Sequence, residues 1–197
     1  MKNPNRKAAA RRSGTTDFVR PDTILVYNSH RGSTHEYAEW ITKALDCDVM
    51  SYSRKMLGVT TYYKNVIFMG WVKGTEITKL NVLKQNQANF HLSDKNLIIV
   101  AVGAMEPTEK YIDALRFRNG ITEDGPGTFF YLPGRFDPAS LSPTNKSALK
   151  MMMPGMCSIE PEKADEVVKR FETGYDGVDK KNILPIVEVV MQTRIDR

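Results

Sequence analysis

Residues 23–45, TILVYNSHRGSTHEYAEWITKAL, decide the fold expected for this chain. Thr23 to Asn28 is a run of β-branched and apolar residues that is typical of a buried strand. From Thr34 to Leu45, apolar residues recur at helical spacing, which predicts an amphipathic helix. The turn between them, SHRGST from Ser29 to Thr34, contains Gly32. This stretch therefore predicts a strand that feeds a helix through a short turn.

Strand-like and helix-like segments continue to alternate along the chain. Five strands with helices between them favour a parallel sheet that is covered on both faces, because parallel strands need crossover connections. We therefore predict an α/β, doubly wound, five-stranded parallel sheet with helices on both faces. The further strands are expected at Cys47–Tyr52, Asn65–Met69, Asn96–Val102 and Thr128–Leu132, and the further helices at Ile77–Phe90, Thr108–Phe117, Asn145–Met153 and Glu160–Glu172.

The positive charge of the chain is concentrated at its N-terminus. The 197 residues, 41% of them hydrophobic, suit one domain with a real core, and the formal net charge is +5. Residues 1–20 hold six basic residues and one acid, so the remainder is neutral and a nucleic-acid partner is not expected. We interpret 1–20 as a disordered basic arm and 21–197 as one α/β domain. The arm either contacts an anionic surface, such as a membrane, or is a solvated extension.

The sequence contains no obvious membrane span, export signal or cysteine motif. No apolar run approaches the roughly 20 residues of a transmembrane helix, and no apolar segment follows Arg11 and Arg12 as a twin-arginine signal requires. We therefore expect a cytoplasmic protein. Cys47 and Cys157 have neither redox nor zinc spacing, so we expect two buried, reduced thiols and no metal site.

The turn from Ser29 to Thr34 is the candidate site for a phosphate group. In a doubly wound sheet, ligands bind beyond the carboxyl ends of the strands, where the strand order reverses. Gly32 permits a tight turn in which successive backbone amides converge on an anion. The hydroxyl groups of Ser29, Ser33 and Thr34 add hydrogen-bond donors, and the helix N-terminus adds partial positive charge. The alternative is a ligand-free capping box, because Ser33 precedes Glu36 by three residues.

Four motifs in order resemble flavodoxin domains of the menaquinone-dependent, protoporphyrinogen-oxidase-like branch. SHRGST is similar to the phosphate-binding signature T-x-T-G-x-T, and the others are VIFMGWVKGTEI, LIIVAVGAMEP and FYLPGRFDPASLSPTNKSALKMMM. The similarity extends over roughly residues 23–191. It implies a flavodoxin-like sheet of order 2-1-3-4-5 that binds flavin mononucleotide (FMN) non-covalently and transfers electrons through it.

The resemblance also implies which residues contact FMN. Ser29, Gly32 and Thr34 match the signature and, with His30 and Ser33, would hold the phosphate, while Arg31 stands where many flavodoxins have a threonine. Trp71 either stacks on the isoalloxazine ring or packs against a helix. The aromatic residue often found after the fourth strand is absent, which leaves one flavin face open or covered by Met105. The flavin-flanking loops would contribute Gly70, Trp71, Val72 and Lys73 after the third strand and Val102, Gly103, Ala104 and Met105 after the fourth.

The segment from Pro133 to Ser158 is long and rich in methionine, and Met151, Met152 and Met153 follow one another in it. Flexible thioethers suit contacts with a partner or with a planar molecule such as a quinone or a porphyrin, although a helix buried against the sheet is the alternative. We expect this segment to select the electron acceptor and not to hold FMN. Arg118 and Arg135 are candidates for the carboxylates of a tetrapyrrole.

Three functions follow from these observations. The preferred one is an FMN-binding protein that passes electrons to a redox partner protein. The alternatives are an enzyme similar to quinone-dependent protoporphyrinogen dehydrogenase and a flavodoxin-like scaffold without cofactor. Catalytic residues stay unknown, because His30, His35 and His91 are expected to be surface or capping residues.

Overall fold

A parallel sheet of five strands lies at the centre of the described part of the chain. The computed structural model describes residues 21–30, 32–55 and 57–195, so the basic arm expected at 1–20 lies outside the described residues. The order β2-β1-β3-β5-β6 confirms the predicted α/β class and the predicted order 2-1-3-4-5. The strands are β1 (Thr23–Asn28), β2 (Asp48–Ser51), β3 (Asn65–Lys73), β5 (Asn96–Gly103) and β6 (Thr128–Pro133), with a short β4 (Glu76–Ile77) antiparallel to the end of β3.

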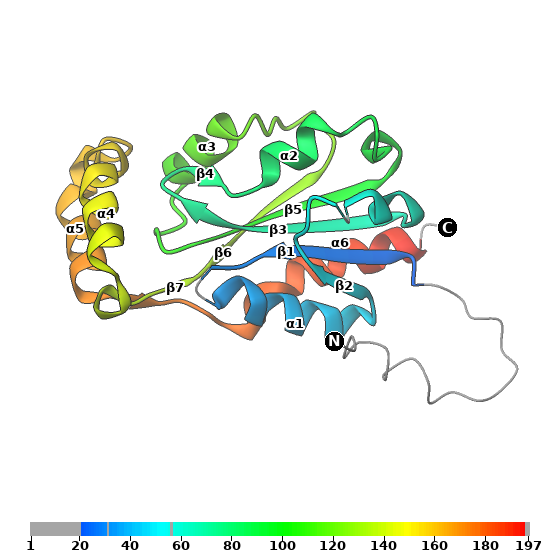
Figure 1. The fold of residues 1–197 in the computed structure, drawn as a ribbon, viewed down its shortest axis with the longest axis horizontal. Helices are drawn as coiled ribbons and strands as arrows, with labels where there is room; N and C mark the ends of the chain where they lie inside the picture. Colours follow the sequence, from blue (N-terminus) through cyan, green and yellow to red (C-terminus); the bar gives the residue numbers. More distant parts are fainter. Residues whose placement is uncertain (1–20, 31, 56, 196–197) are drawn as a thin grey trace, which may run out of the picture.

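Helices cover both faces of this sheet (Figure 1). α1 (Ser33–Leu45) and α6 (Leu184–Ile195) lie on one face, and α2 (Leu80–Gln85) and α3 (Glu109–Arg118) lie on the other. Because successive side chains of a strand point to opposite faces, Leu25 packs in the first layer, while Ile24 and Val26 pack in the second. The strands are apolar on both faces, as in other sheets that are covered by helices.

The region after β3 differs from the predicted single helix at Ile77–Phe90. Gly74, with φ +62°, turns the chain back so that β4 pairs with β3, and α2 is only six residues long. Gly70–Lys73, expected in a loop, therefore belong to β3. The hairpin is favoured because Thr78 donates from its backbone N and its Oγ1 to the Trp71 carbonyl, at 3.0 and 2.8 Å.

The C-terminal helix α6 was not expected from the sequence. Its run of valine and isoleucine has no clear helical period, because it is apolar almost all round. Ile186 and Val190, one turn apart, are fully buried against the sheet and α1. Burial from two sides therefore decides this helix, against the β propensity of its residues.

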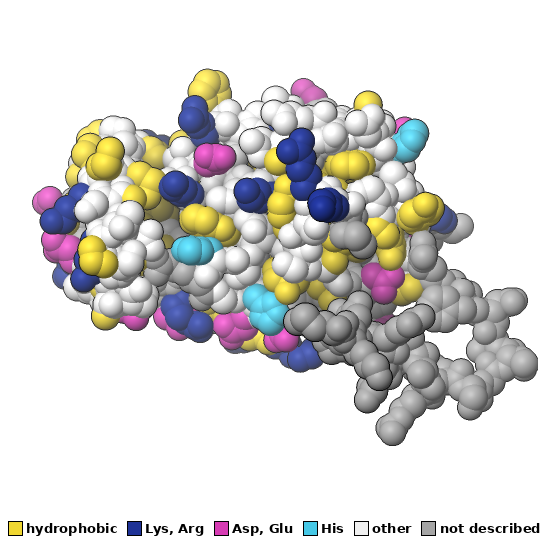
Figure 2. Space-filling model, viewed as in Figure 1, with side chains coloured by type: hydrophobic (Ala, Val, Ile, Leu, Met, Phe, Trp, Pro, Cys, Tyr) yellow, Lys and Arg dark blue, Asp and Glu magenta, His cyan; other side chains and the backbone are white. Residues whose placement is uncertain are grey.

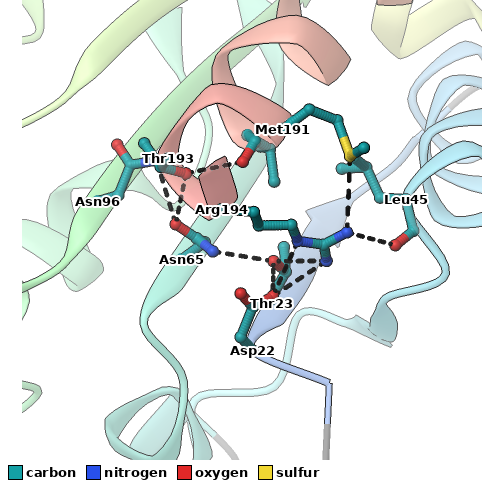
Figure 3. Close-up of polar contacts among 9 residues, drawn as sticks. Asp22, Thr23, Leu45, Asn65, Asn96, Met191, Thr193 and Arg194 are labelled. Atoms are coloured by element: carbon teal, nitrogen blue, oxygen red, sulfur yellow. Dashed lines mark hydrogen bonds and ion pairs between the residues drawn. The ribbon is translucent and has the colours of Figure 1, made fainter. Parts of the chain in front are cut away.

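A polar network ties α6 to the amino ends of the strands (Figure 3). The Arg194 guanidinium donates to the carboxylate of Asp22, to Oγ1 of Thr23 and to the carbonyl of Leu45, at 3.0 to 3.1 Å. Thr193 contacts Asn65 in the same group, at 3.2 Å. This network closes the end of the sheet that is opposite the predicted phosphate site.

Residues 135–176 form a unit that we call the helical insertion, and it lies between β6 and α6 in the chain. Its ends form a two-stranded ribbon, β7 (Arg135–Phe136) with β8 (Tyr175–Asp176), and its helices are α4 (Pro143–Cys157) and α5 (Ala164–Thr173). In Figure 1, α4 and α5 stand beyond one end of the sheet. α4 is longer than predicted, and Pro161–Lys163 form a separate 3-10 turn (η5) before α5.

Within the described ranges, no helix has the length and apolar character that crossing a membrane requires. Cys47 is buried as expected, whereas Cys157 is only half-buried, because it lies on the side of α4 that faces a surface groove. Both thiols are free.

Candidate functional site

The turn after β1 ends in a glycine whose backbone conformation few other residues adopt. Gly32 has φ +96° and ψ −35°, caps the N-terminus of α1, and accepts a hydrogen bond from the Glu36 amide at 2.9 Å. The capping-box alternative is wrong, because Ser33 is already inside the helix and its Oγ accepts a hydrogen bond from the Arg135 amide at 3.0 Å. Arg31 lies outside the described residues.

The first turn of α1 faces the carboxyl edge of the sheet with two hydroxyl residues. Ser33 is 6% exposed and Thr34 is 2% exposed, so both side chains sit inside the molecule and not on its surface. The first amides of an α-helix have no partner within the helix, and the helix dipole adds partial positive charge there. This end of α1 is therefore suited to an anion.

Trp71 lies near the end of β3, beside this turn. Its backbone is paired with Val102 of β5, and its half-buried side chain stacks on the imidazole of His30, with ring centroids 4.9 Å apart and planes at 24°. This stack therefore brings the turn after β1 into contact with the end of β3.

Two tyrosines, the buried Tyr111 and the partly buried Tyr131, support the end of β5. Tyr131 donates to the Met105 carbonyl at 2.7 Å, and its ring meets that of Tyr111 edge-on. Burial raises the pKa of both phenols well above their ordinary value, so they stay protonated. A Cβ at Gly103 would lie 2.7 Å from the Tyr131 hydroxyl, which explains why a glycine occupies this position.

A cavity of about 330 Å³ lies where these three strand ends meet. Among the described residues predicted for the site, Ser29 and Gly32 lie in the adjoining turn. Gly70 instead packs beneath the β3–β4 hairpin, where a Cβ would lie 2.7 Å from Ile77 Cγ2. The predicted residues that line the cavity are His30, Ser33, Thr34, Trp71, Val72, Lys73, Val102, Gly103, Ala104 and Met105.

The helical insertion forms the opposite wall of the same cavity, which the sequence reasoning did not foresee. One face of α4 points inward, because its lining residues recur at intervals of three and four along the helix. The spacing of Leu149, Met152 and Met156 was the signal that could have indicated this face, whereas nothing in the sequence marks Phe171. The insertion contributes Arg135, Phe136, Leu141, Asn145, Ala148, Leu149, Met152, Met156 and Phe171, and Gly74, Tyr111 and Gly134 complete the wall.

The charge of Arg135 is already paired within the protein. Its Nε donates to Asp176 at 2.7 Å, and its Nη1 lies 3.5 Å from a carboxylate oxygen of Glu36. The hydrogen bond to Asp176 raises the pKa of the guanidinium further. Arg135 therefore lines the cavity as part of an ion-pair group, while Arg118 lies in the last turn of α3 and does not line this cavity.

The comparison with protein families identifies the class to which this chain belongs. The family model described as a flavodoxin domain matches residues 24–157, which is more than half of the chain. The chain therefore belongs to this flavodoxin family, and membership suggests a flavin cofactor. No curated protein matches the sequence significantly.

Solved structures with a similar arrangement have low sequence identity to this chain. The Trp repressor binding protein from Bacillus subtilis is 18% identical, with a TM-score of 0.45, over 66% of this chain and 94% of that one. Oxidised flavodoxin 2 from Bacillus cereus is 14% identical, with a TM-score of 0.35, over 72% and 99%. A flavodoxin from the domain Archaea is 16% identical, with a TM-score of 0.33, over 74% and 98%. The family assignment rests on the model match and not on these scores.

Proposed function

We propose that this protein binds FMN non-covalently in the cavity and transfers electrons through it to a redox partner protein. One observation carries the proposal: the helix N-terminus after β1, the indole at the end of β3 and the loop after β5 line one cavity at the carboxyl edge of the sheet. This is the place where open α/β sheets bind nucleotide-type ligands.

The residues present fit a phosphate monoester that is joined to a flat ring. Gly32 holds a positive φ at the start of α1, and Ser33 and Thr34 bring hydroxyl groups to the cavity wall. Together with the dipole of α1, these groups would hold the phosphate. Trp71 would contact the ring, because its half-buried indole lines the same cavity.

The protein side of the chemistry is binding, orientation and exclusion of water. FMN, when bound, supplies the redox chemistry, and the protein adjusts it through stacking and local charge. The inward face of α4 would keep water from one side of the ligand. Within the described cavity wall, Lys73 and Arg135 are the basic side chains, and no carboxylate lines it. Because Arg135 is already paired with Asp176 and Glu36, Lys73 is the basic side chain that would attract an anionic ligand.

The experiment is an absorption spectrum of the purified protein, followed by titration of the flavin-free protein with FMN, FAD and riboflavin. We expect a flavin spectrum, with FMN bound more tightly than riboflavin because riboflavin lacks the phosphate. Equal affinity for FMN and riboflavin would contradict the phosphate site. Purified protein that neither contains nor binds any flavin would favour the cofactor-free scaffold instead.

A second candidate function is an enzyme similar to quinone-dependent protoporphyrinogen dehydrogenase. The observation that favours it is the apolar inner face of the helical insertion, where Phe136, Leu149 and Met152 present an apolar surface to the same cavity. The pairing of Arg135 with Asp176 speaks against this arginine as the ligand of a tetrapyrrole carboxylate. Anaerobic reduction followed by re-oxidation with a quinone, and reduction by protoporphyrinogen, distinguish this enzyme from an electron carrier that reacts only with a partner protein.

A further inference from the structure

The stack between His30 and Trp71 connects two elements that the proposed function uses separately. His30 belongs to the turn expected to hold the phosphate, and Trp71 belongs to the strand end expected to contact the flavin ring. Their ring centroids are 4.9 Å apart, their planes differ by 24°, and both side chains line the cavity. One face of the indole is thus covered by the imidazole.

The backbone of Trp71 is firmly held, whereas its side chain has more freedom. Its carbonyl accepts two hydrogen bonds from Thr78, and the Thr78 hydroxyl in turn accepts one from the Asn28 amide group at 2.8 Å. None of these bonds reaches the indole, which still turns about its two side-chain torsions. The stack on His30 is therefore a contact that restricts the orientation of the ring.

We propose that His30 is a positioning residue for the flavin site: its imidazole holds the Trp71 indole in place, so that a flavin stacks on the face of the indole that His30 leaves uncovered. This inference rests on the proposed function, because it concerns how the same cavity receives its ligand. His30 itself need not contact the flavin ring. An aromatic pair of this kind contributes enough to change an affinity by about three- to tenfold.

The first measurement uses flavin-free protein, so that it does not depend on cofactor binding. The chain has two tryptophans. A Trp40→Phe background therefore leaves Trp71 as the single indole for near-ultraviolet circular dichroism. We expect His30→Ala to reduce the Trp71 signal and His30→Phe, which keeps a flat ring, to restore it. His35→Ala is the matched control, since His35 is also exposed and its ring meets Tyr27.

The second measurement is a double-mutant cycle on FMN affinity. We expect His30→Ala to weaken binding about three- to tenfold in the wild-type background and to have no effect when Trp71 is already alanine, because His30 acts through the indole. His30 is exposed, so this substitution leaves the core intact.

The outcomes separate the failure of this inference from the failure of the proposed function. An unchanged Trp71 signal in His30→Ala protein overturns the positioning role, whatever the flavin does. An equal loss of affinity with and without Trp71 overturns it as well, and indicates that His30 contacts the ligand directly. If wild-type protein binds no FMN, the proposed function fails and this inference fails with it, even where the dichroism confirms the stack.

Discussion

The backbone conformation of Gly32 offers the sharpest test of the phosphate site. A Cβ built at Gly32 has no neighbouring atom within 4 Å, so Gly32→Ala introduces no clash with the described residues. Its φ of +96°, in contrast, is unfavourable for any residue with a side chain. Forcing alanine into a left-handed conformation costs about 1–2 kcal/mol.

This strain appears in one of two measurements. If the turn keeps its shape, the free energy of unfolding falls by about 1–2 kcal/mol, which lowers the melting temperature by roughly 2–8 °C for a domain of this size. If the turn relaxes instead, the phosphate site is distorted, and FMN affinity falls by roughly 5- to 30-fold, since 1.4 kcal/mol corresponds to tenfold. Thermal unfolding of the flavin-free protein measures the loss of stability, and an FMN fluorescence titration measures the loss of affinity.

Gly58→Ala is the matched control, because Gly58 is also exposed, has open space around its Cβ position and lies in a 3-10 helix (η2, Leu57–Tyr62) without a positive φ. It should be neutral or slightly stabilising. If Gly32→Ala protein kept both the stability and the FMN affinity of the wild type, the turn would not depend on this conformation and our assignment of the phosphate site would be wrong.

Four further predictions test the rest of the molecule. Trp71→Ala should weaken FMN binding by about 1–3 kcal/mol, by analogy with aromatic stacking on nucleic-acid bases; unchanged affinity and an unchanged flavin spectrum would refute stacking. Joining Phe136 to Tyr175 by a short Gly-Ser loop keeps the β7–β8 ribbon but removes α4 and α5. Flavin should remain bound to this variant, while its turnover with electron acceptors falls sharply. Loss of FMN from a folded variant would contradict this prediction. Burial raises the pKa of Cys47 from 9.0 to about 11, so the folded state binds the thiol proton more tightly than the unfolded state does. The stability that this contributes is present below pH 9 and is lost as the pH rises to about 11. Cys47→Ala should therefore reduce the fall in the free energy of urea unfolding between pH 9 and about 11. Arg194→Ala should lower the unfolding free energy by about 2 kcal/mol, since the Leu45 carbonyl and the Asp22 carboxylate lose a charged donor; Arg194→Lys should recover part of it, and a loss below 0.5 kcal/mol would show that the network in Figure 3 is energetically minor.

The charged side chains on the surface do not mark the position of the candidate flavin site. Figure 2 shows Lys and Arg side chains scattered over the face in view, with acidic side chains among them. This agrees with the balanced charge of residues 21–197. The class of ligand therefore follows from the lining of the cavity and not from a charged patch.

Local sequence patterns determined the sheet. Strands β1, β3 and β5 are continuous apolar runs. Apolar runs of strand length that alternate with segments of helical periodicity are typical of a buried parallel sheet. The turn between β1 and α1 was equally readable, because its glycine and hydroxyl residues are adjacent in the chain; that it binds a phosphate stays a prediction. These predictions depend on interactions within a few residues.

What the sequence could not show depends on contacts between distant segments. The tertiary structure decided that α6 is a helix, because Ile186 and Val190 are buried from two sides at once. It also decided that Ser33 bonds Arg135 instead of capping its own helix, and that α4 closes the cavity. A linear sequence does not indicate which face of a helix meets a site more than 100 residues away, because that depends on how the whole chain packs.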